Sequence, residues 1–337
     1  MADANDMRAA WYERQGRARD VIQIGRMARP APAPGEVRVR IHASGLNPTD
    51  VKRRTGFGGM SMDYPRIVPH QDGAGVIDAV GAGVSSRRIG ERVWLYETQH
   101  GRAIGTAAEF AVVPERQALL LPAGVSFAAG AALGVPYMTA HRCLFADGPI
   151  AGTTVFVPGG AGAVGNAAIQ LAKWGGAAMV IATVSRPEQE AVARAAGADH
   201  VIDRKREDVA ERVLALTSGK GVDRIVEISP EQNFAVAQKV LRVNGVVSIY
   251  AMDRADSTLS APLLAMLRNA VTLRWIYIYR LPQALKDAAV RDIGAALADG
   301  ALKPHIGAVY RLDQVAEAHD RLDSGTLIGK AVIALAD

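Results

Sequence analysis

Glycines with the spacing G-x-G-x-x-G stand at Gly160, Gly162 and Gly165, directly after an apolar run at 154–157. In this pattern one glycine makes a tight turn, and the next lets a pyrophosphate approach the backbone. The third lets the following helix pack against the preceding strand. That helix would offer free N–H groups and the positive end of its dipole to phosphate oxygens. The segment Gly160-Ala161-Gly162-Ala163-Val164-Gly165 is therefore a candidate dinucleotide-binding turn.

The end of the next apolar run indicates which dinucleotide fits. A protein built for NAD would place Asp or Glu there to bind the adenosine ribose hydroxyls, but this chain has Ser185-Arg186. The guanidinium of Arg186 suits a 2′-phosphate. The sequence therefore favours NADPH, with Ser185 and Arg186 as ligands and with Arg204 or Lys205, after the third run, as a further contact.

Ser185 has a second interpretation. Ser185 and Glu188 fit an S-x-x-E capping box, with Pro187 in the first turn of the helix. Capping and cofactor binding are compatible at this position, and both stay open.

The elements that would position these residues follow a regular pattern. Apolar runs rich in β-branched residues recur about every 20 to 26 residues, the length that a strand and its crossover helix need. The runs lie at 154–157, 179–184, 200–202, 224–228, 246–250 and 271–276. They predict a doubly wound, six-stranded parallel sheet. Glycines also occur in ordinary turns, so the place of the G-x-G-x-x-G turn after the first predicted strand is what makes it specific.

The first 130 residues indicate strands and turns. Apolar and polar residues alternate at 36–41, as in a half-buried strand, and shorter strands are expected at 76–77, 92–95 and 110–113. A helix is expected at 282–298, followed by a return segment ending at 329–333. This tail is too short to fold alone, so we expect it to pack onto the N-terminal domain.

Composition excludes several classes of protein. The chain has 337 residues, 49% hydrophobic and 22% charged, which suits an ordinary globular protein of two domains. Cys143 is the only cysteine, so neither an intrachain disulfide nor a site of several cysteine thiolates can form. We find neither an apolar run of the roughly 18 residues that span a bilayer nor a signal-peptide core. A cytoplasmic protein without membrane partners is expected.

The charge is basic but scattered. The net charge is +5, and the densest clusters are Lys52-Arg53-Arg54 and Arg204-Lys205-Arg206. These clusters are short and lack interleaved aromatic residues, so they favour a solvated face over a nucleic-acid site.

Together these residues resemble the medium-chain dehydrogenase/reductase superfamily, and within it the zinc-free quinone oxidoreductases that include zeta-crystallin. The resemblance covers nearly the whole chain. Its marks are Gly45-Leu46-Asn47-Pro48-Thr49-Asp50 with Gly56, His70-Gln71-Asp72-Gly73-Ala74-Gly75-Val76-Ile77 with Val80-Gly81, Met138-Thr139-Ala140, the glycine turn, and Gly329-Lys330.

The resemblance implies an α/β protein with two domains. A GroES-like, β-rich catalytic domain would comprise 1–135 and 280–337, and a Rossmann NADPH-binding domain would comprise 136–279. It also implies an active-site cleft at their junction and assembly into homodimers, or sometimes tetramers.

Zinc-dependent members of the superfamily bind a catalytic zinc through cysteine and histidine. In this chain the position of the first cysteine lies around Asn47, and only His70 is left of the ligand set. Catalytic zinc needs about three protein ligands, so no metal site is expected, and His70 is assigned to the core or to the substrate. Without a Lewis acid, we expect substrates that already accept hydride readily.

The resemblance also implies roles for individual residues. Asn47 would bind substrate or cofactor, Thr139 would lie near the nicotinamide, and Lys330 would bind the cofactor. Asp50 is a catalytic candidate for which a structural hydrogen-bonding role is an open alternative. Lys52 stands where bacterial quinone reductases often carry tyrosine. Tyr64 is a candidate polar wall or proton donor, and Lys52 is either an oxyanion partner or a surface residue.

The leading hypothesis is an NADPH-dependent quinone reductase. The alternative within enzymes is reduction of the carbon–carbon double bond of enones or enals. In both, the protein mainly positions the reactants and stabilises an oxygen that gains negative charge. An alternative of another class is a zeta-crystallin-like RNA-binding or structural protein.

Overall fold

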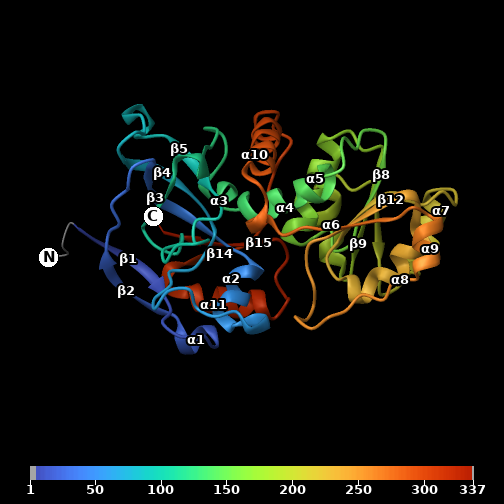
Figure 1. Ribbon diagram of the computed structural model, residues 1–337, viewed down its shortest axis with the longest axis horizontal. Helices are drawn as coiled ribbons and strands as arrows, with labels where there is room; N and C mark the ends of the chain where they lie inside the picture. Colours follow the sequence, from blue (N-terminus) through green and yellow to red (C-terminus); the bar gives the residue numbers. More distant parts are fainter. Residues whose placement is uncertain (1–4, 336–337) are drawn as a thin grey trace. The chain divides into compact units, whose positions relative to one another are not determined.

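The computed structural model describes residues 5–335 and divides into two compact units (Figure 1). Unit 1 contains the chain up to Val135 and again from Pro304 onwards, whereas unit 2 runs from Pro136 to Lys303. The N-terminal and C-terminal parts of the described chain therefore belong to the same unit.

Unit 1 is rich in strands. They are β1 (Asp6–Trp11), β2 (Gln23–Ala28), β3 (Glu36–Leu46), β4 (Asp72–Val80), β5 (Arg92–Leu95), β6 (Phe110–Pro114), β7 (Ala118–Leu120), β14 (Ile306–Arg311) and β15 (Lys330–Ala334). Its helices are α1 (Ala18–Val21), α2 (Pro48–Thr55), α3 (Phe127–Gly130) and α11 (Val315–Asp323). β1 pairs with β2, and the other strands form a seven-stranded sheet within the described residues, in which β15 lies antiparallel to β3. The predicted packing of the C-terminal tail onto the N-terminal domain is confirmed.

β3 shows the predicted alternation. Val37, Val39 and Ile41 are buried and pack with Ile77, on β4, in one core cluster, while the residues between them are half-buried or exposed. β3 is longer than the alternation at 36–41 predicts and reaches Leu46. Its end lies between two other strands, because Gly45 pairs with Asp72 of β4 and Leu46 pairs with Ala331 of β15. The polar residues at these strand ends are thereby brought together.

Unit 2 contains the predicted parallel sheet. Its strands are β8 (Thr154–Val157), β9 (Met179–Val184), β10 (His200–Asp203), β11 (Val222–Glu227), β12 (Leu241–Ile249) and β13 (Thr272–Trp275). Its helices are α4 (Gly134–Phe145, which begins in unit 1), α5 (Ala163–Trp174), α6 (Pro187–Ala195), α7 (Val209–Leu216), α8 (Pro230–Val240), α9 (Leu263–Arg268) and α10 (Gln283–Ala298). The order β10-β9-β8-β11-β12-β13, parallel throughout, confirms the six-stranded, doubly wound sheet in the described part of the chain.

The expected boundary at residue 280 is wrong. The structure places 280–303, including α10, in unit 2. Asp292 accepts a hydrogen bond from His141 Nε2 at 2.7 Å, and Asp299 accepts one from Trp174 Nε1 at 2.9 Å. These bonds hold α10 against α4 and α5, whereas periodicity along the sequence does not show which unit a helix packs against.

No helix in residues 5–335 is long and apolar enough to cross a membrane.

Candidate functional site

The glycine turn lies between β8 and α5, as predicted. Gly162 is the N-cap of α5, and helical residues begin at Ala163. Thr183 of β9 fixes the turn, because its Oγ1 accepts a hydrogen bond from Gly159 N at 3.2 Å and its carbonyl oxygen accepts one from Gly160 N at 3.0 Å. The first N–H groups of a helix have no acceptor inside the helix. The turn thus offers donors to a phosphate.

Two of the glycines are required by close packing. A Cβ on Gly165 would overlap the carbonyl oxygen of Gly159, and a Cβ on Gly160 would lie 2.7 Å from the Cβ of Ala182 on β9. Side chains at these positions would separate α5 from the sheet. The residues present therefore fit a bound dinucleotide, which Ala161, Ala163 and Val164 would contact through their backbones.

The segment after β9 differs in detail from the prediction. The expected capping box of Ser185 and Glu188 is wrong. It requires Ser185 to be the N-cap of α6, but the N-cap is Arg186, so the third residue of the helix is Gln189 and not Glu188. Ser185 N and Oγ both donate to Gln189 Oε1, at 2.9 and 3.2 Å. Pro187 holds the preceding residue in an extended conformation, so the helix begins one residue later than the S-x-x-E pattern suggests.

Two predicted phosphate ligands follow neighbouring strands. Arg186 comes after β9, with its Nε 4.0 Å from Glu188 Oε1, and its side chain is half-buried. Arg204 comes after β10, and its backbone N–H donates to Val184 O at 3.0 Å. The ends of β9 and β10 therefore carry one arginine each. Thr139, the predicted neighbour of the nicotinamide, lies on α4 and is nearly buried.

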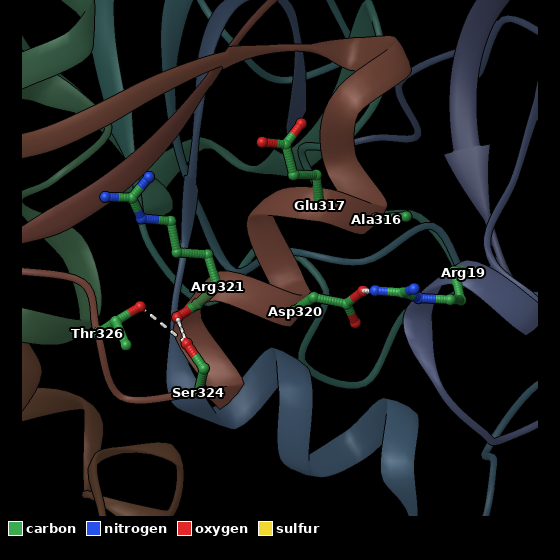
Figure 2. Close-up of a pocket in the computed structure, with 7 residues that line it drawn as sticks. All are labelled: Arg19, Ala316, Glu317, Asp320, Arg321, Ser324 and Thr326. Carbon is green, nitrogen blue, oxygen red and sulfur yellow. Dashed lines mark hydrogen bonds and ion pairs between the residues drawn. The ribbon is translucent and has the colours of Figure 1, made fainter.

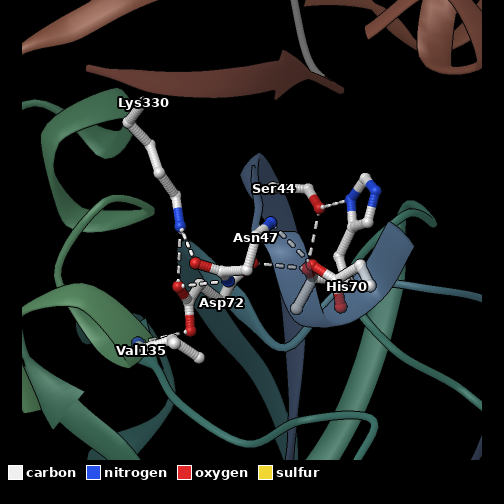
Figure 3. Close-up of polar contacts among 8 residues, drawn as sticks. Ser44, Asn47, His70, Asp72, Val135 and Lys330 are labelled. Carbon is white, nitrogen blue, oxygen red and sulfur yellow. Dashed lines mark hydrogen bonds and ion pairs between the residues drawn. The ribbon is translucent and has the colours of Figure 1, made fainter. Parts of the chain in front are cut away.

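In unit 1, three buried side chains form a group that we call the Asp72 cluster: Asn47, Asp72 and Lys330 (Figure 3). Lys330 Nζ donates to Asn47 Oδ1 at 2.5 Å and to Asp72 Oδ2 at 2.9 Å, and Asn47 Nδ2 donates to the same Asp72 oxygen at 2.8 Å. Asp72 Oδ1 accepts from Val135 N at 2.9 Å. The exposed fractions of Asn47, Asp72 and Lys330 are 1%, 0% and 2%.

The cluster keeps two donors for a ligand. An ammonium group has three N–H bonds and an amide nitrogen has two. Lys330 has two acceptors and Asn47 Nδ2 has one acceptor among the described residues. One N–H of each group is therefore available. A pair of fixed donors in a buried setting can stabilise negative charge that develops on a ligand oxygen.

Asp50 lies beside this cluster. Its Oδ2 accepts a hydrogen bond from Asn47 N at 2.7 Å, which caps α2, while its buried Oδ1 has no hydrogen-bond partner among the described residues. Burial raises the pKa of Asp50 to about 7, although the hydrogen bond from Asn47 opposes the shift. The structural role that the sequence left open for Asp50 is therefore present, and Asp50 remains a candidate acid.

Lys52 and Tyr64 each contact another residue of unit 1. Lys52 Nζ lies 4.4 Å from the ring centre of Phe57, and the Tyr64 hydroxyl donates to Gly101 O at 2.7 Å. Their predicted catalytic roles remain predictions.

His70 belongs to a buried chain of hydrogen bonds. Its Nδ1 lies 2.8 Å from Ser44 Oγ, its Nε2 lies 3.0 Å from His319 Nε2, and Arg54 Nε donates to His319 Nδ1 at 3.4 Å. A guanidinium can only donate, so His319 carries its proton on Nε2 and His70 carries its proton on Nδ1. Both ring nitrogens of His70 are thus engaged, and the side chain lies in the core.

Sequence reasoning missed three of these residues. Asp72 stands within the family motif at 70–77, but the sequence does not indicate a role for it, and no sequence pattern distinguishes Ser44 or His319. A signal for Asp72 was present, because an acid at the start of a strand is placed beside the end of its antiparallel neighbour. His319 had no such signal, since it lies 249 residues from its partner His70.

A separate hollow lies on the surface beside α11 (Figure 2). It is lined by Arg19, Ala316, Glu317, Asp320, Arg321, Ser324 and Thr326. Asp320 forms an ion pair with Arg19 at 2.7 Å. None of the site residues predicted from the sequence lines this hollow.

Comparison with known proteins supports the resemblance to the medium-chain dehydrogenase/reductase superfamily. The family model described as alcohol dehydrogenase GroES-like domain matches residues 33–123, and the model described as zinc-binding dehydrogenase matches residues 163–292. The quinone oxidoreductase of Rattus norvegicus is 30% identical over 308 residues, which cover 91% of each chain. The synaptic vesicle membrane protein VAT-1 homolog of Homo sapiens is 31% identical, over 93% of this chain and 82% of the relative.

Solved structures show the same fold. A mycobacterial protein complexed with NADPH superimposes with a TM-score of 0.83 at 26% identity, covering 98% of this chain and 100% of the other.

Proposed function

Since the chain belongs to the medium-chain dehydrogenase/reductase superfamily, in its quinone oxidoreductase-like branch, we propose that it reduces quinones with NADPH and without zinc. When bound, NADPH supplies the hydride. The observation that carries the choice of cofactor is the pair Arg186 and Arg204 at the ends of adjacent strands, next to the glycine turn. The binding of NADPH by a mycobacterial relative agrees with this assignment.

Independence from zinc is supported by the residues at the positions of the lost ligands. Asn47 Oδ1 accepts a hydrogen bond from an ammonium group, and both nitrogens of His70 are engaged in the core. The single cysteine of the chain, Cys143, is buried in unit 2. Without a metal to withdraw charge from an alcohol, reduction of an activated acceptor is the reaction that such a site favours.

The acceptor is proposed from the donors of the Asp72 cluster. Hydride transfer to a quinone places negative charge on a carbonyl oxygen, and the free N–H groups of Asn47 and Lys330 suit that oxygen. The same donors would serve an enone or enal. Lys52, in place of the tyrosine of bacterial quinone reductases, is the residue that keeps this second substrate class in consideration.

A panel of acceptors separates the two substrate classes. NADPH oxidation would be measured with 1,4-benzoquinone, 1,2-naphthoquinone, a 2-alkenal and a cyclic enone. Quinone turnover at least about tenfold faster than alkenal turnover, in kcat/KM, supports the proposal. Fast alkenal turnover without quinone turnover rejects it in favour of the double-bond reductase.

The choice of cofactor is tested at Arg186. A lost charge-assisted contact weakens binding by roughly 10- to 100-fold, so Arg186→Ala should raise the Kd of NADPH by that factor and change the Kd of NADH by less than about threefold. The control is Arg194→Ala, an exposed arginine on the same helix that pairs with Glu190. Equal losses for NADPH and NADH would exclude a phosphate contact.

We also propose that the chain forms a homodimer through unit 2. β13 is the edge strand of the parallel sheet, and near it Leu263, Leu264, Leu267, Trp275 and Tyr277 are exposed. An unpaired strand edge beside exposed apolar side chains suits a partner that offers the same surface in return, as a two-fold axis does.

A further inference from the structure

The Asp72 cluster holds an ammonium group against Asn47, the residue at the position of the first zinc-binding cysteine of zinc-dependent relatives. We propose that Lys330 is the acid of the reaction: its free N–H binds the acceptor's carbonyl oxygen and donates a proton to it as hydride arrives. This inference rests on the proposed function and gives Lys330 a role in proton transfer in place of the cofactor binding that the resemblance implies.

The first argument is geometric. Lysine is a flexible side chain, yet Lys330 is fixed at both ends. Its backbone N–H donates to His305 O at 3.0 Å, and its Nζ donates to Asn47 and to Asp72. Two of the three N–H bonds are used, so the direction of the third is determined. A donor held in place before the reaction stabilises developing charge without reorganisation.

The second argument concerns charge. A buried ammonium needs a counterion, and Asp72 supplies it at 2.9 Å. When Lys330 loses its proton, Asp72 still accepts hydrogen bonds from Asn47 Nδ2 and Val135 N. The carboxylate is therefore not left without donors, and Lys330 can regain a proton from water. Asp72 acts as a positioning residue for Lys330 and Asn47.

The step balances for both acceptor classes. One quinone oxygen receives the hydride with its two electrons and forms an O–H bond, while the other oxygen becomes C–O⁻. At that second oxygen the Nζ–H bond of Lys330 breaks and a second O–H bond forms. The products are a hydroquinone and the neutral amine of Lys330. One proton from water converts this amine back to the ammonium form. Phenols and alkylammonium groups have similar acidity, so the transfer is nearly balanced in energy. With an enone, hydride adds to the β-carbon and the proton goes to the enolate oxygen.

The other candidate proton donors have competing contacts. The Tyr64 hydroxyl proton is donated to Gly101 O, and Lys52 lies over Phe57. Asp50 is the remaining rival, since its Oδ1 has no partner among the described residues. Asp50→Asn is therefore included in the test.

The test compares Lys330→Met, Lys330→Arg and Asp50→Asn with Lys286→Met, in which a buried lysine of unit 2 is changed. Three quantities are measured: the Kd of NADPH by fluorescence, kcat with a quinone and with an alkenal, and the solvent deuterium isotope effect on kcat. Because Lys330→Met leaves Asp72 buried without a counterion, Lys330→Met/Asp72→Asn is measured as well. This double variant removes both charges and protects the test from a folding failure.

We expect Lys330→Met and the double variant to lower kcat for the alkenal by about 100-fold or more. The loss should be smaller for the quinone, whose reduced oxygen is the weaker base. The Kd of NADPH should change by less than about threefold, a small difference on the binding scale. Lys330→Arg should retain part of the activity and lose the isotope effect, because guanidinium keeps its proton. Asp50→Asn and Lys286→Met should keep the isotope effect.

Two results would overturn the inference. One is a large rise in the Kd of NADPH with unchanged kcat in Lys330→Met, which makes Lys330 a cofactor ligand only. The other is loss of the isotope effect in Asp50→Asn but not in Lys330→Arg, which makes Asp50 the acid. Failure of the proposed function is distinct, because it is measured on the wild-type protein. Alkenal turnover without quinone turnover rejects the quinone proposal and leaves this inference to be decided with the alkenal, whereas turnover of neither acceptor rejects both.

Discussion

Asp50 is a buried carboxyl group with one hydrogen-bonded oxygen and one unbonded oxygen. Desolvation raises its pKa from 3.8 to about 7. Between these values the unfolded chain has released the proton and the folded protein retains it. The stabilising contribution of the protonated group is therefore present at low pH and is lost as the pH rises through about 7.

Asp50→Asn removes this pH dependence while an amide oxygen can still cap Asn47 N. The free energy of unfolding of the variant, relative to wild type, should rise between about pH 5 and about pH 8, by about 2.7 kcal/mol at most. Urea unfolding at the two pH values measures it. A difference that does not change with pH would show that Asp50 is ionised throughout.

The buried pair His70 and His319 gives the protein's stability the opposite dependence on pH. Burial lowers the pKa of His70 to about 3 and that of His319 well below 6.5. Below about pH 6.5 the unfolded chain binds protons that the folded protein does not. The stability due to this pair is therefore complete above that pH and decreases as the pH falls.

His319→Gln tests the pair, because an amide can accept from Arg54 and donate to His70. Below about pH 6.5, the free energy of unfolding of wild type should fall by about 1.4 kcal/mol per pH unit for each of the two buried histidines. The variant keeps only His70, so its free energy of unfolding should fall with half the wild-type slope. Thermal unfolding from about pH 5 to pH 7.5 measures the two slopes. Parallel curves would contradict the neutral, buried state of His319.

At the scale of elements, the cofactor proposal depends on the strand–turn–helix segment formed by β8, the glycine turn and α5. Because a Cβ on Gly165 would overlap Gly159 O, Gly165→Ala should move α5 away from β8. We expect the Kd of NADPH to rise at least about tenfold, together with a lower melting temperature. The control is Gly294→Ala on α10, where a Cβ meets no atom within 4 Å.

The control should be stabilised by about 0.5 to 1 kcal/mol, as expected for alanine in place of glycine within a helix. Unchanged NADPH binding in Gly165→Ala would mean that the turn does not hold the pyrophosphate. Fluorescence titration and thermal unfolding of both variants decide between these outcomes.

The elements themselves were largely predictable from sequence. Apolar runs separated by crossover lengths placed all six strands of unit 2, because the signal for such a strand is local. The S-x-x-E pattern places the N-cap of α6 one residue too early, because it does not take into account that Pro187 keeps Arg186 extended. The role of Asp72 was not predicted, because it depends on the ends of β3, β4 and β15 meeting in space.

At the scale of the whole molecule, the proposed dimer makes a direct prediction. Light scattering should give twice the single-chain mass of 35.6 kDa for wild type and about the single-chain mass for Leu267→Glu on α9. Leu267 is 78% exposed. The control is Leu120→Glu on β7 of unit 1, at a leucine that is 66% exposed, and it should remain dimeric. A dimer that survives Leu267→Glu would have another interface.

The assignment of cofactor and metal also concerns the whole chain, because the glycine turn and the Asp72 cluster lie in different units. The most direct test is steady-state NADPH oxidation by a quinone, with protein dialysed against a strong zinc chelator. We predict full turnover after dialysis and a kcat/KM for NADPH at least about tenfold above that for NADH, since Arg186 and Arg204 favour the 2′-phosphate. Turnover only after zinc is added back, or an equal or higher kcat/KM for NADH, would contradict the account.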